Sequence, residues 1–364
     1  MTVLDTRALN RAALARQHLL DRTDAPALDV IGHLCGMQAQ EPQEPFTGLW
    51  SRVREFRTGT LDALLNGREV VRLPLMRRTI HLMTADDALA WRARHGTMLQ
   101  SRVLTTYKAE LAAVDPDELA AAGRAVMADG APRTMAELVQ AVSDRWPDPP
   151  RRALGELLVS GVIPMVQLPP RGLWGTRDGV RNQTLAHWLG REVPPLPEDA
   201  TDPVGQTLLR RYLAAYGPAT SGDLRAWCGL TGLPAAVKAV RDELVSFRDE
   251  RGRELLDLPD APRPDPDTPA PVRFLPAFDN AILGYQDRGR IIDDAHRLLS
   301  VAGERVLLVD GRVSATWTLK EGVLAVAPLR PLSRTERAAV TEEGGALASF
   351  LTDGASDGVR VEAP

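Results

Sequence analysis

Residues 205–258 read GQTLLRRYLAAYGPATSGDLRAWCGLTGLPAAVKAVRDELVSFRDERGRELLDL and form one compact pattern. Apolar side chains recur at helical spacing in three short segments, and Gly217-Pro218 ends the first of them. The segment after them, residues 244–258, has strand composition on both sides of a polar turn at Glu250-Arg251-Gly252. Three short helices followed by a hairpin predict a winged helix, the helix-turn-helix variant with a β wing.

The same order of elements recurs twice upstream. Residues 134–160 predict two helices, and IPMVQLPPRGLWGTRDG (163–179) predicts two strands around Pro-Pro-Arg-Gly. Nearer the N-terminus, the apolar pattern predicts helices over 28–35, 46–53 and 61–65, strands in 70–75 and 77–83, and a helical connector over 84–127. The sequence therefore predicts three winged-helix units in tandem.

Two proline-rich segments divide the chain, at 193–204 and 259–271. The last ninety residues alternate short apolar runs with glycine turns, which predicts an antiparallel, barrel-like β module. The fold class expected is α+β. The expected domains are 1–83 (first unit), 84–192 (connector and second unit), 193–258 (linker and third unit) and 259–364 (linker and β module).

The composition limits the classes of protein to which this chain can belong. The chain has 364 residues, of which 44% are hydrophobic and 25% charged, values typical of a folded chain. No apolar run approaches 18 residues and the N-terminus lacks a long apolar region, so we expect no membrane span and no secretory signal. Two cysteines supply neither a disulfide framework nor a zinc cluster. A cytoplasmic protein is expected.

Charge is unevenly distributed along the chain. The net charge is −4, yet residues 51–108 hold eleven Lys and Arg against five Asp and Glu. A basic face on an acidic protein is typical of a concave basic cleft that binds a polyanion. The cations are almost all arginine, which suits phosphate recognition but also follows from GC-rich coding. Three winged helices, one of them basic, favour DNA binding, although winged helices also serve as protein-interaction modules.

The common catalytic motifs are missing from the sequence. There is no HExxH, no GxSxG, no phosphate-binding loop with a Walker lysine and no GxGxxG after a strand. We therefore expect no metal and no cofactor.

The segment GMQAQEPQEP (36–45) is the candidate site. Gly36 can end the preceding helix, and the prolines prevent its renewal. In an extended chain, Gln38 and Gln40 point to the same side, while Ala39 faces the core. Two neighbouring amides can hold and orient a water molecule without acting as a strong base. The alternative is a polar loop whose glutamines face solvent.

Three segments carry a family resemblance: Gln38-Ala39-Gln40, VVRLPLMRRTIHLM (70–83) and LPAFDNAILGYQDRGRII (275–292). Together they resemble the bacterial AlkZ-like DNA glycosylases over essentially the whole chain. The resemblance implies three winged helices around a concave basic surface, with Gln38 and Gln40 as the catalytic pair. Position 40 is not a carboxylate, which points to the Gln-Gln branch and to bulky crosslinks. A DNA-probing hairpin of the family is placed in 275–292.

The resemblance also implies the activity and the partner. The expected enzyme is a monofunctional DNA N-glycosylase, a hydrolase that acts as a monomer on double-stranded DNA with alkylated or crosslinked guanine. It would release N7-alkylguanine, unhook crosslinks of the azinomycin type in antibiotic self-resistance and leave abasic sites. Expected DNA contacts are Arg52, Arg54, Arg57, Arg72, Arg77, Arg78 and His81, with Asp279, Asn280, Asp287, Arg288 and Arg290.

Two other classes stay open. A winged-helix transcriptional regulator without catalytic activity would bind a specific sequence, but no long dimerisation helix is evident and the Gln-Ala-Gln motif would have no role. An interaction scaffold would bind proteins, which the basic segment disfavours.

Overall fold

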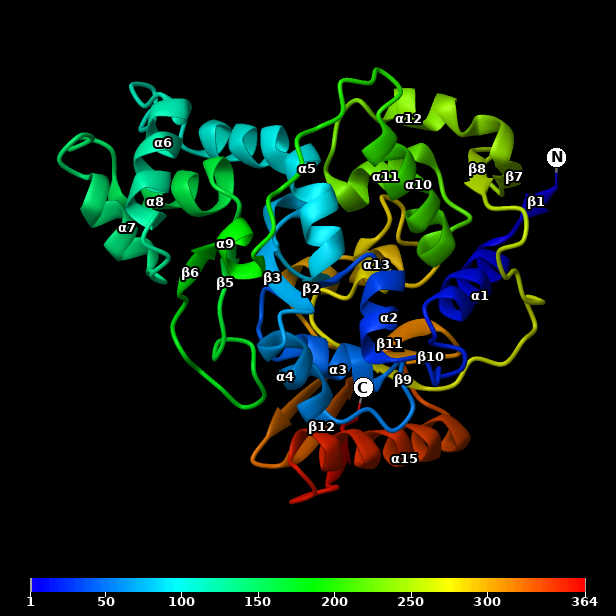
Figure 1. Cartoon of the computed structure of the whole chain (residues 1–364). Coiled ribbons are helices and arrows are strands. Elements are labelled where there is room, and N and C mark those ends of the chain that lie inside the picture. The colour runs from blue at the N-terminus through cyan, green and yellow to red at the C-terminus, as the bar shows by residue number, and fades with distance from the viewer. Residues whose placement is uncertain (1, 364) are drawn as a thin grey trace.

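The computed structural model describes residues 2–363 and shows a mixed α+β fold, which confirms the expected class (Figure 1). Its central sheet has the strand order β2-β4-β3-β5-β6, and every pair in it is antiparallel. The strands are β2 (Met37–Gln38), β3 (Val70–Pro74), β4 (Ile80–Thr84), β5 (Met165–Gln167) and β6 (Asn182–Thr184).

Two helix groups each precede a strand pair of this sheet. The first group is α2 (Ala27–His33), α3 (Glu44–Trp50) and α4 (Thr58–Asn66); the second is α6 (Pro116–Met127), α7 (Met135–Val142) and α8 (Arg151–Glu156), which continues as a π-helix over Leu157–Val162. The long α5 (Ala85–Thr106) connects them, and α9 (Leu185–Leu189) follows β6. The expected hairpin of β3 and β4 is therefore present, and β3 also pairs with β5, which joins β5 and β6 to the same sheet.

The third helix group matches the expected order of elements. It contains α10 (Pro203–Tyr216), α11 (Ser221–Cys228), α12 (Leu233–Ala239) and the hairpin of β7 (Val245–Asp249) and β8 (Glu254–Asp257). Thr220 caps α11, because its hydroxyl accepts from the Asp223 amide while the Asp223 carboxylate accepts from the Thr220 amide. Helix α1 (Thr6–Arg16) follows β1 (Val3–Leu4), which adds a parallel strand to β7.

The prediction of a barrel-like C-terminal module is wrong. The C-terminal sheet is open, with the order β13-β12-β11-β10-β9 and a parallel pair at β12 and β13. Its strands are β9 (Arg273–Leu275), β10 (Val306–Val309), β11 (Arg312–Lys320), β12 (Val323–Pro328) and β13 (Val359–Val361). Helix α15 (Arg334–Leu351) packs on this sheet, so its apolar face is covered by a helix rather than by barrel closure.

The placement of a hairpin in 275–292 is also wrong. After β9 the chain forms the short α13 (Asn280–Leu283) and turns, and α14 (Leu299–Ala302) follows before β10. Ala281, Tyr285 and Ile292 are each at most 1% exposed. The apolar residues of the segment are therefore part of the core, and residues 276–292 contain no strand pair that could enter DNA.

The second strand of the middle unit lies later than predicted. We expected it directly after Pro-Pro-Arg-Gly, yet β6 begins at Asn182. The residues between form a loop whose Leu173 and Trp174 pack on the first unit, with Trp174 4.9 Å from Phe46 between ring centroids. Tertiary packing thus replaces strand pairing for this apolar run.

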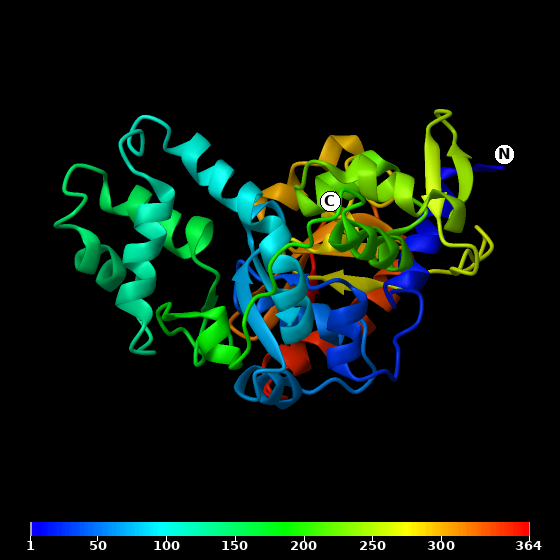
Figure 2. The ribbon, with the colours of Figure 1, turned by 45° about the horizontal axis from the view of Figure 1, so that its top comes forward.

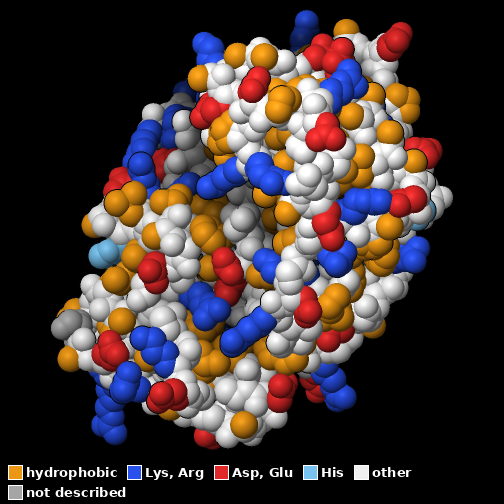
Figure 3. All heavy atoms as spheres, turned by 90° about the vertical axis from the view of Figure 1, so that its left-hand side faces the viewer, with side chains coloured by type: hydrophobic (Ala, Val, Ile, Leu, Met, Phe, Trp, Pro, Cys, Tyr) orange, Lys and Arg blue, Asp and Glu red, His pale blue; other side chains and the backbone are white. Residues whose placement is uncertain are grey.

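The α6–α8 unit projects to one side, and α5 joins it to the rest of the molecule (Figure 2). Viewed from that side, the surface is hollowed, and Lys and Arg side chains lie around the hollow (Figure 3). No helix within residues 2–363 is long and apolar enough to cross a membrane.

Candidate active site

The Gln-Ala-Gln motif lies at the β2 edge of the central sheet. Gln38 pairs in register with His81 of β4, and the Ala39 amide donates to the Ile80 carbonyl at 2.8 Å. Ala39 is fully buried, which confirms the prediction that it faces the core. Gln38 is 9% exposed, whereas Gln40 lies on the surface. The two amides therefore flank a buried anchor but differ in their access to solvent.

A glycine allows the chain to reach this edge. Gly36 has φ +87°, a conformation that L side chains rarely adopt. A Cβ at this position would lie 2.0 Å from the Met83 sulfur and 2.9 Å from the Leu82 carbonyl oxygen. The absence of a side chain at Gly36 therefore allows the motif to lie this close to β4.

One arginine joins the three segments that carry the family resemblance. Arg77 Nη2 donates to Gln38 Oε1 at 2.7 Å and to Asn280 Oδ1 at 3.0 Å. Its Nη1 donates to the Trp227 carbonyl at the end of α11. Residues far apart in the sequence thus meet at one guanidinium group, which the sequence placed only as a DNA contact.

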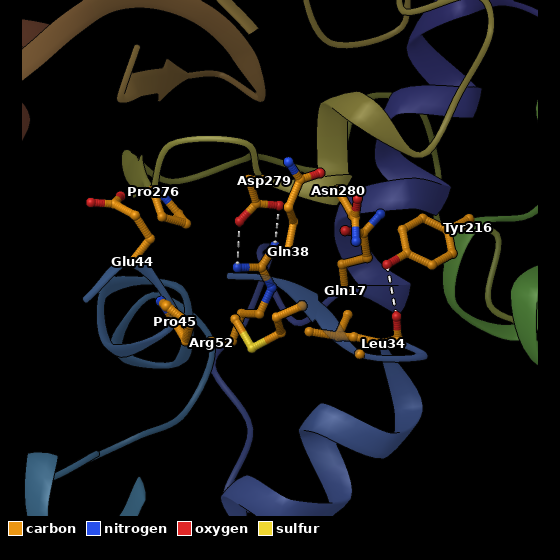
Figure 4. Close-up of a pocket in the computed structure, with 12 residues that line it drawn as sticks. Gln17, Leu34, Gln38, Glu44, Pro45, Arg52, Tyr216, Pro276, Asp279 and Asn280 are labelled. Carbon is orange, nitrogen blue, oxygen red and sulfur yellow. Dashed lines mark hydrogen bonds and ion pairs between the residues drawn. The ribbon is translucent and has the colours of Figure 1, made fainter. Parts of the chain in front are cut away.

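Gln38 and Asn280 also line a small pocket with Gln17, Glu44, Arg52 and Asp279 (Figure 4). An ion pair crosses it, because the two Arg52 terminal nitrogens lie 2.9 and 2.8 Å from the Asp279 oxygens. Both side chains are almost fully buried. Asp279 also caps α13 by accepting from the Ala281 amide. The charges of this pair are balanced inside the protein.

Arg72 contacts the backbone of the motif. It is 1% exposed, and its Nη2 donates to the Ala39 carbonyl at 3.0 Å. Burial, and then the charge of nearby Arg171, lower the pKa of the Arg72 guanidinium from 12.5 to about 10. Burial likewise lowers the pKa of Arg77 to about 10. Both groups stay charged at neutral pH, and neither forms an ion pair with a carboxylate in the described part of the chain.

The other predicted DNA contacts lie at varied positions, and their role in DNA binding stays a prediction. Arg57 is exposed at the start of α4, and His81 is fully buried. Several already have partners: Arg54 lies 3.5 Å from Asp24, Arg78 lies 3.3 Å from Glu156, Asp287 pairs with Arg251 and Arg253, Arg288 donates to Ser300, and Arg290 donates to the Pro218 carbonyl.

Sequence reasoning missed two residues near the site. Gln17 lines the pocket, and neither atom of its buried amide has a partner within residues 2–363. Arg171 lies in the loop after β5, close enough to affect Arg72. Neither residue belongs to a recognisable motif. Arg171 stood in the Pro-Pro-Arg-Gly segment, which was interpreted only as a turn.

His81, which pairs with Gln38 in the sheet, makes the stability of the protein depend on pH. Burial, and then the charge of Arg77, lower the pKa of His81 from 6.5 to about 3. Between these two pH values the unfolded chain binds a proton that the folded chain does not. Stability is therefore full above pH 6.5 and falls as the pH drops towards 3.

We expect His81→Gln to flatten this dependence. The measurement is the free energy of unfolding in urea between pH 7 and pH 4. As the pH falls, this free energy should decrease more steeply in the wild type than in the variant, by up to about 1.4 kcal/mol per pH unit. Equal slopes for the two proteins would show that His81 is protonated in the fold.

The family of the chain follows from its match to known proteins. Residues 31–350, which include Gln38, Arg77 and Asn280, match the family described as DNA glycosylase AlkZ-like. The chain therefore belongs to the AlkZ-like DNA glycosylases, enzymes that hydrolyse the bond between base and sugar, and the resemblance predicted from its motifs is confirmed.

A relative and a solved structure agree with this family. The interstrand DNA cross-link repair glycosylase of Streptomyces sahachiroi is 30% identical over 365 residues, which cover 92% of this chain and 93% of the relative. The solved structure of Streptomyces sahachiroi DNA glycosylase AlkZ has a TM-score of 0.78 at 24% identity. The match covers 99% of this chain and 100% of that chain, so it supports the fold over its full length.

Proposed function

We propose that this protein hydrolyses the N-glycosidic bond of N7-alkylguanine in double-stranded DNA and so unhooks interstrand crosslinks, leaving abasic sites. The observation that carries the proposal is the pair of amides, Gln38 and Gln40, held on the sheet edge by hydrogen bonds, with Arg72 and Arg77 bound to the same motif and without an ion-pair partner among residues 2–363. The Streptomyces relative is named for interstrand DNA cross-link repair, which favours a crosslinked duplex as the substrate. The biological setting in this proposal is self-resistance to crosslinking antibiotics of the azinomycin type.

The chemistry needs no acid for the leaving group. An ordinary glycosidic bond requires one, but guanine alkylated at N7 is already cationic. When the bond from C1′ to N9 breaks, its electron pair neutralises the ring. A water oxygen then bonds to C1′ and loses a proton to solvent. The protein has to position the water and the sugar, and oriented dipoles can contribute on the order of several kcal/mol to this step.

The rest of the molecule has a corresponding role. The three helix groups with their strand pairs act as winged helices, within the domain boundaries expected above, and the hollow in Figure 3 is the cleft for DNA. The enzyme acts as a cytoplasmic monomer. A crosslinked guanine is tethered to the opposite strand, so we expect an open cleft and little or no full base flipping.

The direct test is incubation of the purified protein with a duplex that contains one 7-methylguanine, and with a second duplex crosslinked through guanine N7. Alkali is then used to break the strand at abasic sites. We expect breaks at the lesion only after alkali, and none in the unmodified duplex. The three lysines, at 108, 238 and 320, lie outside the residues around the motif, so no Schiff base should form.

The two other classes predict different outcomes. Sequence-specific binding without any abasic site would favour the transcriptional regulator, and no affinity for DNA would favour the interaction scaffold. Strand breaks without alkali would contradict a monofunctional enzyme.

A further inference from the structure

The two glutamine amides are held by the same hairpin, β3–β4. Gln38 Oε1 accepts from Arg77 Nη2 at 2.7 Å, and Gln40 Oε1 accepts from the Ile80 amide at 3.2 Å. Both carbonyl oxygens are therefore engaged by donors within the protein. Each oxygen keeps a second lone pair, but the contact turns the carbonyl end of the amide towards its donor and leaves the N–H₂ end of Nε2 directed away from it.

Arg77 fixes a second amide in the same way. Its Nη2 also donates to Asn280 Oδ1, and Asn280 Nδ2 is buried without a partner in residues 2–363. One guanidinium nitrogen thus orients the carbonyls of both Gln38 and Asn280 towards itself. Because an amide has one carbonyl end and one N–H₂ end, this contact decides which end faces away from the arginine.

The guanidinium group is itself held in place. Arg77 has φ 56° and Arg78 has φ 65°, so two successive non-glycine residues adopt the left-handed conformation at the hairpin turn. Arg77 Nη1 donates to the Trp227 carbonyl, and a Cβ at Gly229 would lie 3.2 Å from the Arg77 nitrogen. The turn therefore packs against the end of α11, and the Arg77 side chain points towards the motif rather than into solvent.

We propose that Arg77 is a positioning residue that fixes the Gln38 amide, so that Gln38 acts on the substrate as a hydrogen-bond donor through Nε2. This inference rests on the proposed function. An N–H directed at the oxygen of the attacking water leaves another lone pair of that oxygen free to face C1′. Arg77 also keeps a positive charge next to the amide, which strengthens the hydrogen bond that holds it.

The test separates positioning from phosphate binding. In Arg77→Ala, we expect single-turnover excision of 7-methylguanine at saturating enzyme to slow about 10- to 100-fold, with Kd for DNA and its salt dependence unchanged. Added guanidinium ion should restore part of the rate, because it can occupy the position of the lost group. Arg210→Ala, which removes an exposed arginine paired with Glu243 on another surface, is the control and should keep the wild-type rate.

Arg77→Lys covers the case in which the alanine variant does not fold. It keeps the charge but cannot reproduce the contacts of a planar guanidinium with Gln38, Asn280 and Trp227, so its rate should also fall while its unfolding temperature stays near that of the wild type. The inference is overturned if either variant keeps the wild-type rate at saturation. It is also overturned if Kd weakens and the salt slope falls by about one unit at an unchanged rate, which marks a phosphate contact. A wild-type protein that releases no base overturns the proposed function as well.

Discussion

Replacement of Gln38 and Gln40 together by alanine should slow single-turnover release of 7-methylguanine about 100-fold or more. The variant loses both amides at the sheet edge while Ala39, their buried anchor, stays in place. Removal of one preorganised hydrogen-bond donor from an active site costs about 10²- to 10³-fold in other enzymes, so the loss of two amides should exceed that of either one. The measurement is the rate of abasic-site formation with enzyme in excess over DNA.

A matched control uses the same change at another place. Gln206 lies in the first turn of α10, and its amide donates hydrogen bonds to Thr201 just before the helix. Gln206→Ala should keep the wild-type rate. Binding of undamaged DNA should be nearly unchanged in both variants. A double variant that excises at the wild-type rate would contradict the assignment of the catalytic pair.

Asp279→Ala should lower the free energy of unfolding by about 3–5 kcal/mol, because it leaves the buried charge of Arg52 without a partner. The same change removes the side-chain cap of α13. We expect the loss in urea unfolding at pH 7. The sequence placed Arg52 and Asp279 among the DNA contacts, and this measurement separates a structural pair from a DNA contact.

The control for this prediction is an exposed arginine–carboxylate pair that also makes two hydrogen bonds. Glu243 accepts two hydrogen bonds from Arg210, at 2.8 and 2.7 Å, but both side chains are exposed. Glu243→Ala should cost only about 0–1 kcal/mol. If Asp279→Ala were as stable as the wild type and lost only its affinity for DNA, the pair would be a DNA contact instead.

Local signals in the sequence predicted much of the fold. In the third unit, the helix end at Gly217-Pro218 and the hairpin around the polar turn at Glu250-Arg251-Gly252 were predicted correctly, since these features depend on neighbouring residues. Helix α15 was not predicted, because the last ninety residues were interpreted as a β module. In the structure Gly344 allows close packing, since a Cβ there would lie 3.2 Å from the Phe274 ring. That contact spans seventy residues, and no local pattern reveals it.

The site, like the fold, has features that the sequence could predict and features that it could not. The motif and its buried Ala39 could be predicted, because strand alternation fixes which residue faces the core. The contact of Arg77 with Gln38 and Asn280 could not, because it depends on a left-handed turn and on the docking of three distant segments. Basic residues in the sequence indicated DNA binding, but burial decides which of them are free to bind it, and Arg52 and Arg72 are each 1% exposed.

The central claim is that a leaving base with its own positive charge allows neutral amides to complete the cleavage. The most direct measurement compares single-turnover excision of cationic 7-methylguanine with that of neutral hypoxanthine in the same duplex context at pH 6, where 7-methylguanine keeps its N1 proton and its positive charge. We predict release of the cationic base and no release of the neutral one. Comparable excision of hypoxanthine would require an acid for the leaving group and would contradict the account.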